Sequence, residues 1–149
     1  MKALLVIDIQ DGYIEEYEDC LLGRINQRIA DAKNSREYVV YIKNTKLLRS
    51  GKKIAELAKG LAVVSDIIFV KEQANAFACD ELLKFLGQND IHNVELIGVD
   101  GNSCIASSAM GAKKLGYNVS LRLECIGRKN KERFRCVIQA LAGKGIRME

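Results

Sequence analysis

Three side chains of different chemistry, Asp8, Lys71 and Cys104, each follow an apolar run of the sequence. A cysteine thiolate can attack a carbonyl or imine carbon and form a covalent intermediate. A nearby carboxylate can take the thiol proton and later pass it to the leaving group, and an ammonium group stabilises both negative charges. Together the three residues predict nucleophilic chemistry at a carbonyl-type carbon, with the backbone N–H of Cys104 as a donor to the oxyanion.

The residues around Cys104 place it just after a strand and at the start of a helix. The apolar run at residues 94–99 is typical of a buried strand, and a turn at residues 100–102 follows it. The helix beyond it ends at Gly116, a typical C-cap, and has apolar residues at three- and four-residue spacing: Ile105, Ala109, Ala112 and Leu115. The positive end of a helix favours a thiolate over a thiol. The alternative interpretation is that Cys104 is a small buried hydrophobe, as many cysteines are.

Apolar runs alternate with helical patterns along the chain. The predicted strands are residues 3–8, 38–43, 67–70, 94–99 and 118–123, the last with the alternation of an edge strand. Besides the helix after Cys104, the predicted helices are residues 20–34, 50–59, 81–86 and 131–141.

This alternation predicts βαβ units and a parallel sheet, and right-handed crossovers make it doubly wound. We therefore predict one domain, residues 1–149, with a three-layer α/β/α, Rossmann-like fold and a sheet of five or six strands in the order 3-2-1-4-5. Asp8 and Cys104 would then lie at the carboxyl ends of neighbouring strands, where open α/β sheets bind ligands. Lys71 would need the loop at residues 72–77 to bring it back to them.

The composition is that of a globular protein, with 149 residues, of which 48% are hydrophobic and 28% charged. The net charge of +4 is too small for the dense basic stripe of a nucleic-acid-binding protein, and an anionic small molecule fits it better. A strand follows Met1 and Lys2 directly, and neither a cleavable segment nor an apolar span of about 18 residues is present. We therefore expect a cytoplasmic protein without a membrane partner.

Five cysteines are spread along the chain without a CxxC pair, which fits neither a disulfide framework nor a zinc site. We interpret Cys125 as structural, and Cys20, Cys79 and Cys136 as packing residues. The single histidine, His92, is expected in a surface loop. No GxGxxG or GxxxxGKS/T motif occurs, so a nucleotide cofactor lacks support.

Three segments resemble the isochorismatase-like cysteine hydrolases, a group that includes nicotinamidases and N-carbamoylsarcosine amidases. They are ALLVIDIQDGY, VKEQANAF and LIGVDGNSCIASSAMGAKKLGYNVSL, in the order of the family and over most of the chain. The resemblance implies that Asp8, Lys71 and Cys104 are the proton shuttle, the electrostatic support and the nucleophile of a catalytic triad.

The resemblance also implies details of the pocket. Gln10, Tyr13 and Phe77 would lie near its mouth. A cis peptide bond at Val99–Asp100 would turn the Asp100 N–H toward the oxyanion, beside the N–H of Cys104.

The sequence departs from the family where metal and substrate are bound. Zinc-binding members use an aspartate and two histidines after the second strand, whereas residues 44–66 contain no histidine and only Asp66. We therefore predict no metal and no cofactor. Gly101 replaces the usual threonine of the nucleophile turn, and Glu124 and Cys125 replace the usual Asp-Ala.

Three hypotheses for the function remain open. The first is a metal-independent cysteine hydrolase of a small amide, carbamoyl or related substrate, with a depressed thiol pKa at Cys104. The second is a non-catalytic protein that keeps the fold for small-molecule binding or assembly. The third is a thiol redox protein that pairs Cys104 with Cys125. The resemblance further implies a homo-oligomer.

Overall fold

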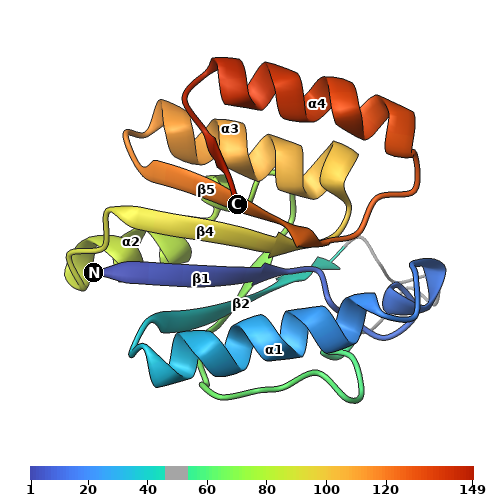
Figure 1. Cartoon of the computed structure of the whole chain (residues 1–149). Helices are drawn as coiled ribbons and strands as arrows, with labels where there is room; N and C mark the ends of the chain where they lie inside the picture. The colour runs from blue at the N-terminus through green and yellow to red at the C-terminus, as the bar shows by residue number, and fades with distance from the viewer. Residues whose placement is uncertain (46–53) are drawn as a thin grey trace.

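A computed structural model describes residues 1–45 and 54–149, and within these ranges six strands form one parallel sheet (Figure 1). The strands are β1 (Lys2–Ile7), β2 (Tyr38–Asn44), β3 (Ile68–Lys71), β4 (Asn93–Gly98), β5 (Asn118–Ile126) and β6 (Arg147–Met148). Their order is β3-β2-β1-β4-β5-β6. The predicted order of five strands is confirmed, and β6 is the short sixth strand.

Helices cover both faces of the sheet. In the described ranges the α-helices are α1 (Leu21–Asn34), α2 (Asp80–Gln88), α3 (Ala106–Lys114) and α4 (Lys131–Gly143). α1 lies on one side of the sheet, and α3 and α4 lie on the other (Figure 1). α2 shares the side of α3 and α4, because Leu82, Ala109 and Leu141 from these three helices belong to one apolar cluster. The predicted three-layer α/β/α fold is confirmed.

β1 is apolar along its length because both of its faces are covered. Leu5 and Ile7 belong to the apolar cluster beneath α2, α3 and α4. Leu4 and Val6 point to the other side and pack in the cluster beneath α1. β1 pairs with β2 on one side and β4 on the other, so the switch point of the sheet lies between β1 and β4, with Asp8 at its carboxyl end.

Some predicted elements differ from the structure. β5 extends to Ile126 and pairs with β6, so it is not an edge strand. Part of the predicted helix at residues 50–59 lies outside the described residues, and its remainder, residues 54–59, contains no helix but forms an isolated bridge between Leu57 and Gln10. Leu115 follows α3 and is 54% exposed, while Gly116 has the left-handed φ of 92° that a C-cap glycine adopts.

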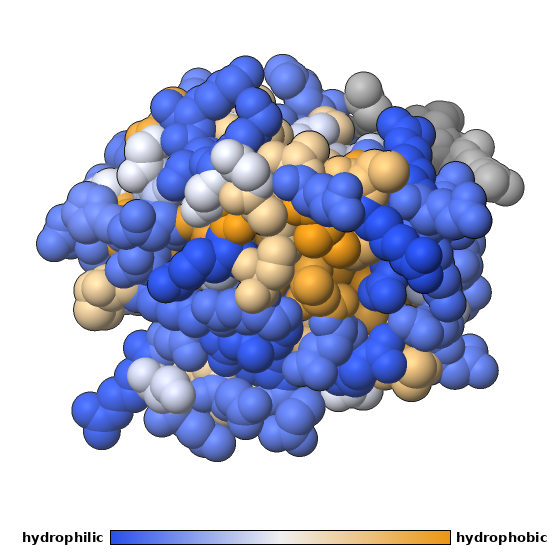
Figure 2. All heavy atoms as spheres, turned by 45° about the horizontal axis from the view of Figure 1, so that its top comes forward, coloured by the Kyte–Doolittle hydropathy of each residue, from blue (hydrophilic) through white to orange (hydrophobic). Residues whose placement is uncertain are grey.

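None of the helices in the described ranges is both long enough and apolar enough to span a membrane. Figure 2 turns the side that carries α4 toward the viewer and shows hydrophilic side chains over most of it, around an apolar area near the centre.

Candidate active site

Cys104 lies in a wide turn between β4 and α3. The Val99–Asp100 peptide bond is cis, as the resemblance implies, and Gly101–Ile105 forms a π-helical turn. The Asp100 carboxylate caps this turn by accepting a hydrogen bond from the N–H of Asn102 at 2.8 Å. Cys104 therefore lies in the first helical turn after β4, as predicted, but this turn is π-helical and precedes α3.

The structure explains the glycine at position 101 of this turn. A Cβ atom there would lie 2.6 Å from Cε1 of Phe134 and 3.1 Å from Cγ2 of Ile126. Phe134, on α4, is 3% exposed and fills the space that a threonine side chain would need. Glycine at position 101 thus makes room for the Phe134 ring, which packs against the nucleophile turn from α4.

Asp8 follows β1 directly and is 3% exposed. Its φ of 58° lies in the left-handed region, which aspartate tolerates better than most residues, and its N–H donates to the carbonyl of Ile42 at 2.9 Å. The buried Oδ1 atom has no hydrogen-bond partner among the described residues. An unpaired buried acceptor is costly and calls for an explanation; here the Oδ1 atom is available to receive a proton.

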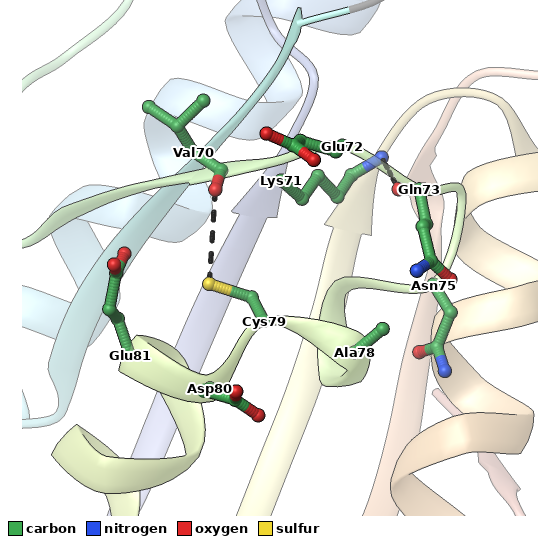
Figure 3. Close-up of a pocket in the computed structure, with 9 residues that line it drawn as sticks. All are labelled: Val70, Lys71, Glu72, Gln73, Asn75, Ala78, Cys79, Asp80 and Glu81. Carbon is green, nitrogen blue, oxygen red and sulfur yellow. Dashed lines mark hydrogen bonds between the residues drawn. The ribbon is translucent and has the colours of Figure 1, made fainter.

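Lys71 is the last residue of β3 and is 2% exposed. Its Nζ atom lies 3.2 Å from Oδ2 of Asp8, 3.3 Å from Sγ of Cys104 and 3.1 Å from the carbonyl of Gln73. Figure 3 shows the extended side chain running from the strand toward Gln73. The prediction that the loop at residues 72–77 carries Lys71 back is wrong, because its own side chain spans the distance. The structure thus brings Asp8, Lys71 and Cys104 together.

The charges of these three groups depend on one another. Burial raises the pKa of the Cys104 thiol, the charge of Asp8 raises it further, and Lys71 opposes both. Burial also raises the pKa of Asp8, against the ammonium of Lys71. The expected depression of the thiol pKa is therefore wrong for this site, because one buried ammonium balances only one of the two acids. The cluster favours a single proton shared between Asp8 and Cys104.

Sequence reasoning missed Asn44, the last residue of β2. This residue is 5% exposed, and its Nδ2 atom lies 3.5 Å from Oδ2 of Asp8 and 3.8 Å from Sγ of Cys104. An asparagine after an apolar strand is usually a turn residue, so its type carries little signal. The pairing of Asn44 with Lys71 between β2 and β3 is the feature that indicates a place for Asn44 in the cluster.

The three residues expected near the pocket mouth lie in different surroundings. Gln10 is fully buried, and its amide bonds to backbone groups of Asn44 and Ala55. Phe77 is 3% exposed and packs against Tyr117 with ring centroids 5.3 Å apart. Tyr13 is half-buried. The structure therefore places Gln10 and Phe77 in the interior and leaves only Tyr13 partly accessible.

The nucleophile turn also offers a backbone donor. The N–H of Asp100 donates to no group of the described residues. The Asp100 carboxylate fixes the turn, because it accepts from Tyr17 Oη at 3.0 Å and from the N–H of Lys129 at 3.1 Å. A developing oxyanion beside Cys104 would find this N–H unpaired and firmly held.

One cavity borders the cluster at Lys71, and a second lies at the nucleophile turn. One, of about 250 Å³, is lined by Lys71 and Cys79 among others, with acidic side chains around it (Figure 3). The other, of about 440 Å³, touches the nucleophile turn at Ser103 and carries Lys129 and Arg133 on its wall. Small molecules thus have room beside the ammonium and beside the nucleophile turn.

The cysteines other than Cys104 have different environments. Cys125 is buried in the cluster beneath α1, whereas Cys104 packs against the cluster on the opposite face of the sheet. This separation removes the proximity that a Cys104–Cys125 redox pair requires and agrees with the structural role predicted for Cys125. Cys20 and Cys136 are exposed, so the prediction that they are packing residues is wrong.

Within residues 1–45 and 54–149, the side chains do not form the ligand set that zinc requires. No group of three or more histidine, cysteine or acidic side chains in the described part of the chain is arranged to hold a metal ion. His92, an exposed loop residue as predicted, precedes β4 and pairs with Asp90 at 2.9 Å. It therefore lies at the amino edge of the sheet, whereas the cluster lies at the carboxyl edge.

The fold and the cluster define a Rossmann-like α/β protein with thiol, carboxyl and ammonium groups at the switch point of its sheet. The family model described as Isochorismatase domain matches residues 2–148. The chain belongs to the isochorismatase family. No curated protein matches the sequence.

Solved structures share the fold at low sequence identity. The pyrazinamidase/nicotinamidase from Streptococcus mutans UA159 is 20% identical, with a TM-score of 0.84 and 100% of both chains covered. The N-carbamoylsarcosine amidase from Thermoplasma acidophilum is 18% identical, with a TM-score of 0.82, covering 99% of this chain and 95% of that one. The pyrazinamidase of Pyrococcus horikoshii in complex with zinc is 20% identical, with a TM-score of 0.79 and coverage of 99% and 98%.

Proposed function

We propose that the protein is a metal-independent cysteine hydrolase that cleaves a small amide, carbamoyl or related substrate through a thioester on Cys104. The observation that carries this proposal is the position of the Lys71 ammonium, 3.2 Å from the Asp8 carboxylate and 3.3 Å from the Cys104 sulfur. A buried ammonium between a proton acceptor and a thiol stabilises the charge wherever the proton resides.

Acylation begins with transfer of the thiol proton to Asp8. The sulfur then forms a bond to the carbonyl carbon, and the carbonyl π electrons move to oxygen. The N–H groups of Asp100 and Cys104 bind the resulting oxyanion. When the C=O bond re-forms, the C–N bond breaks, and Asp8 returns its proton to the leaving nitrogen, so ammonia or an amine departs and a thioester remains.

Deacylation repeats these proton transfers with water as the nucleophile and the sulfur as the leaving group. Asp8 takes a proton from water, and the water oxygen adds to the thioester carbon. Collapse of the second oxyanion breaks the C–S bond, and Asp8 passes the proton back to the sulfur. The raised pKa of Asp8 suits it to hold a proton between these steps.

A non-catalytic small-molecule-binding protein is the second candidate. The observation that favours it is the raised pKa of the Cys104 thiol, because a protein that no longer needs a nucleophile has no reason to maintain a thiolate. The amidase relatives and the intact cluster of Asp8, Lys71 and Cys104 favour the hydrolase.

The test is release of ammonia or amine from a panel of small amides and carbamoyl compounds. We expect the wild type to hydrolyse at least one member, and Cys104→Ala to lose at least about 10³-fold of that rate, because the nucleophile is gone. Cys136→Ala, which changes an exposed cysteine on α4, is the matched control and keeps the rate. Binding without turnover by the wild type would favour the second candidate, and activity that survives Cys104→Ala would exclude the thioester.

A further inference from the structure

Asn44 contacts the same two acceptor atoms as Lys71 but carries no charge. The Nδ2 atom lies 3.5 Å from Oδ2 of Asp8 and 3.8 Å from Sγ of Cys104. A primary amide nitrogen has two hydrogens, one for each acceptor. Asn44 can therefore donate to the negative charge whether the charge lies on the carboxylate or on the sulfur.

The backbone of Asn44 is held independently of its side chain. Gln10 Oε1 accepts from the Asn44 N–H at 2.9 Å, and Gln10 Nε2 donates to the Asn44 carbonyl at 3.4 Å and to the Ala55 carbonyl at 2.9 Å. Gln10 is fully buried, and residue 44 pairs with Lys71 in the β2–β3 register. Two nitrogen donors from neighbouring strands are thus fixed over one carboxylate and one thiol.

We propose that Asn44 is a positioning residue that holds Asp8 and Cys104 in line for proton transfer and donates to whichever of the two is charged. This inference rests on the proposed function and deepens it. The proton moves between Sγ and the carboxylate, while the amide keeps both of its hydrogens. Asn44 therefore acts through Asp8 and Cys104, and Gln10 keeps it in place.

The test measures the pH midpoint of Cys104 alkylation by iodoacetamide in the substrate-free protein, read from the mass of the Cys104 peptide. The titratable groups of the described residues that shift the pKa of this thiol are Asp8, which raises it, and Lys71, which lowers it. We expect Asn44→Ala to raise the midpoint by about one pH unit, because the thiolate loses a donor. Asn44→Asp should raise it further, since it adds a negative charge. The pH profile of hydrolysis should shift in the same direction.

The matched control is Asn118→Asp, an exposed position at the amino end of β5, which should leave the midpoint unchanged. Both Asn44 variants keep the backbone bonds to Gln10, and circular dichroism shows whether they are folded. If one variant is unfolded, the alkylation midpoints of the other variant and of Asn44→Ser test the inference. Wild-type midpoints in folded Asn44 variants would overturn the inference. Alkylation requires no substrate, so a wild type that hydrolyses nothing would remove the proposed function without removing this shift.

Discussion

At the scale of single residues, Asp8 and Cys104 compete for one proton beside one ammonium. Each carries a pKa above its ordinary value because both are buried. A thiol that is neutral at rest and next to a strengthened base does not need to be ionised in advance. In the proposed mechanism its proton passes to Asp8 at the start of acylation, and the raised pKa of Asp8 favours this transfer.

Asp8→Asn separates the two effects of this carboxylate. Removing its charge should lower the pH midpoint of Cys104 alkylation by about one unit, because Asp8 raises the thiol pKa. Hydrolysis should nevertheless fall by about 10²–10⁴-fold, since the proton acceptor is lost. Asp90→Asn, exposed at the opposite edge of the sheet, is the control for both measurements. A midpoint that rises, or hydrolysis that persists, would contradict this role of Asp8.

Residue types and order predict that Asp8 and Cys104 lie at the ends of neighbouring strands, because parallel strands end at one edge of the sheet. They do not predict that the Lys71 side chain itself reaches both residues from β3. The sign of the thiol pKa was not predictable, since it depends on how deeply the cluster is buried. Asn44 was missed for a related reason: its contacts follow from the β2–β3 register, which a single sequence does not define.

At the scale of elements, the π-turn that holds Cys104 depends on its contact with α4. Gly101→Thr would push a side chain into Phe134, whose ring leaves only 2.6 Å to the position of the Cβ atom. We expect the free energy of unfolding to fall by about 1–3 kcal/mol, with slower hydrolysis because Cys104 shifts with the turn. Urea denaturation and the hydrolysis rate measure the two effects.

The controls test the contact itself. Phe134→Ala combined with Gly101→Thr should recover part of the hydrolysis lost in the single variant, because the clash is removed. Gly87→Ala lies in α2, where a Cβ atom meets nothing within 4 Å, and should not reduce stability. A Gly101→Thr protein as stable and active as the wild type would show that the turn does not depend on this packing.

Periodicity predicted most elements but not the turns between them. The run at residues 94–99 predicted β4 closely, whereas the π-turn after it was not predictable, because it depends on a cis bond and on Phe134, 30 or so residues later in the chain. The alternation at residues 118–123 predicts an edge strand, and the two-residue β6 that pairs with this strand is too short to leave a sequence pattern.

At the scale of the whole molecule, one buried carboxylate on the α1 side joins distant segments. Glu95 on β4 is fully buried and accepts from Lys2 at 2.8 Å, Arg28 at 2.7 Å and Arg122 at 2.9 Å. These partners belong to β1, α1 and β5. Burial by itself would raise the pKa of Glu95, but the bonds from Arg122, Arg28 and Lys2 outweigh it and lower the pKa to about 2.

Glu95→Gln should lower the free energy of unfolding at pH 7 by about 3–5 kcal/mol, because it leaves buried cations without their carboxylate. The folded-state pKa lies below the unfolded value, so this stabilisation is present above pH 4.5 and is lost as pH falls toward about 2. The difference between wild type and variant in urea denaturation should therefore shrink over that range. Glu18→Gln, in an exposed pair with Arg24, should leave the stability close to that of the wild type, because solvent screens this pair. Equal losses in the two variants would contradict the network.

The order of the strands in the sheet is predictable from the right-handedness of βαβ crossovers. The ion-pair network around Glu95 is not predictable in this way. Glu95 occupies one place in an otherwise apolar strand, and its partners lie up to 93 positions away. Their convergence depends on the packing of α1 against β4 and β5, which periodicity does not specify.

The most direct test of the central claim is the mass of the Cys104 peptide during a single turnover of an amide that the wild type hydrolyses, quenched with acid. We expect an acyl group on this peptide that forms before the free acid appears and that hydroxylamine removes. Acid production while the Cys104 peptide stays unmodified throughout, together with turnover by Cys104→Ala, would contradict it.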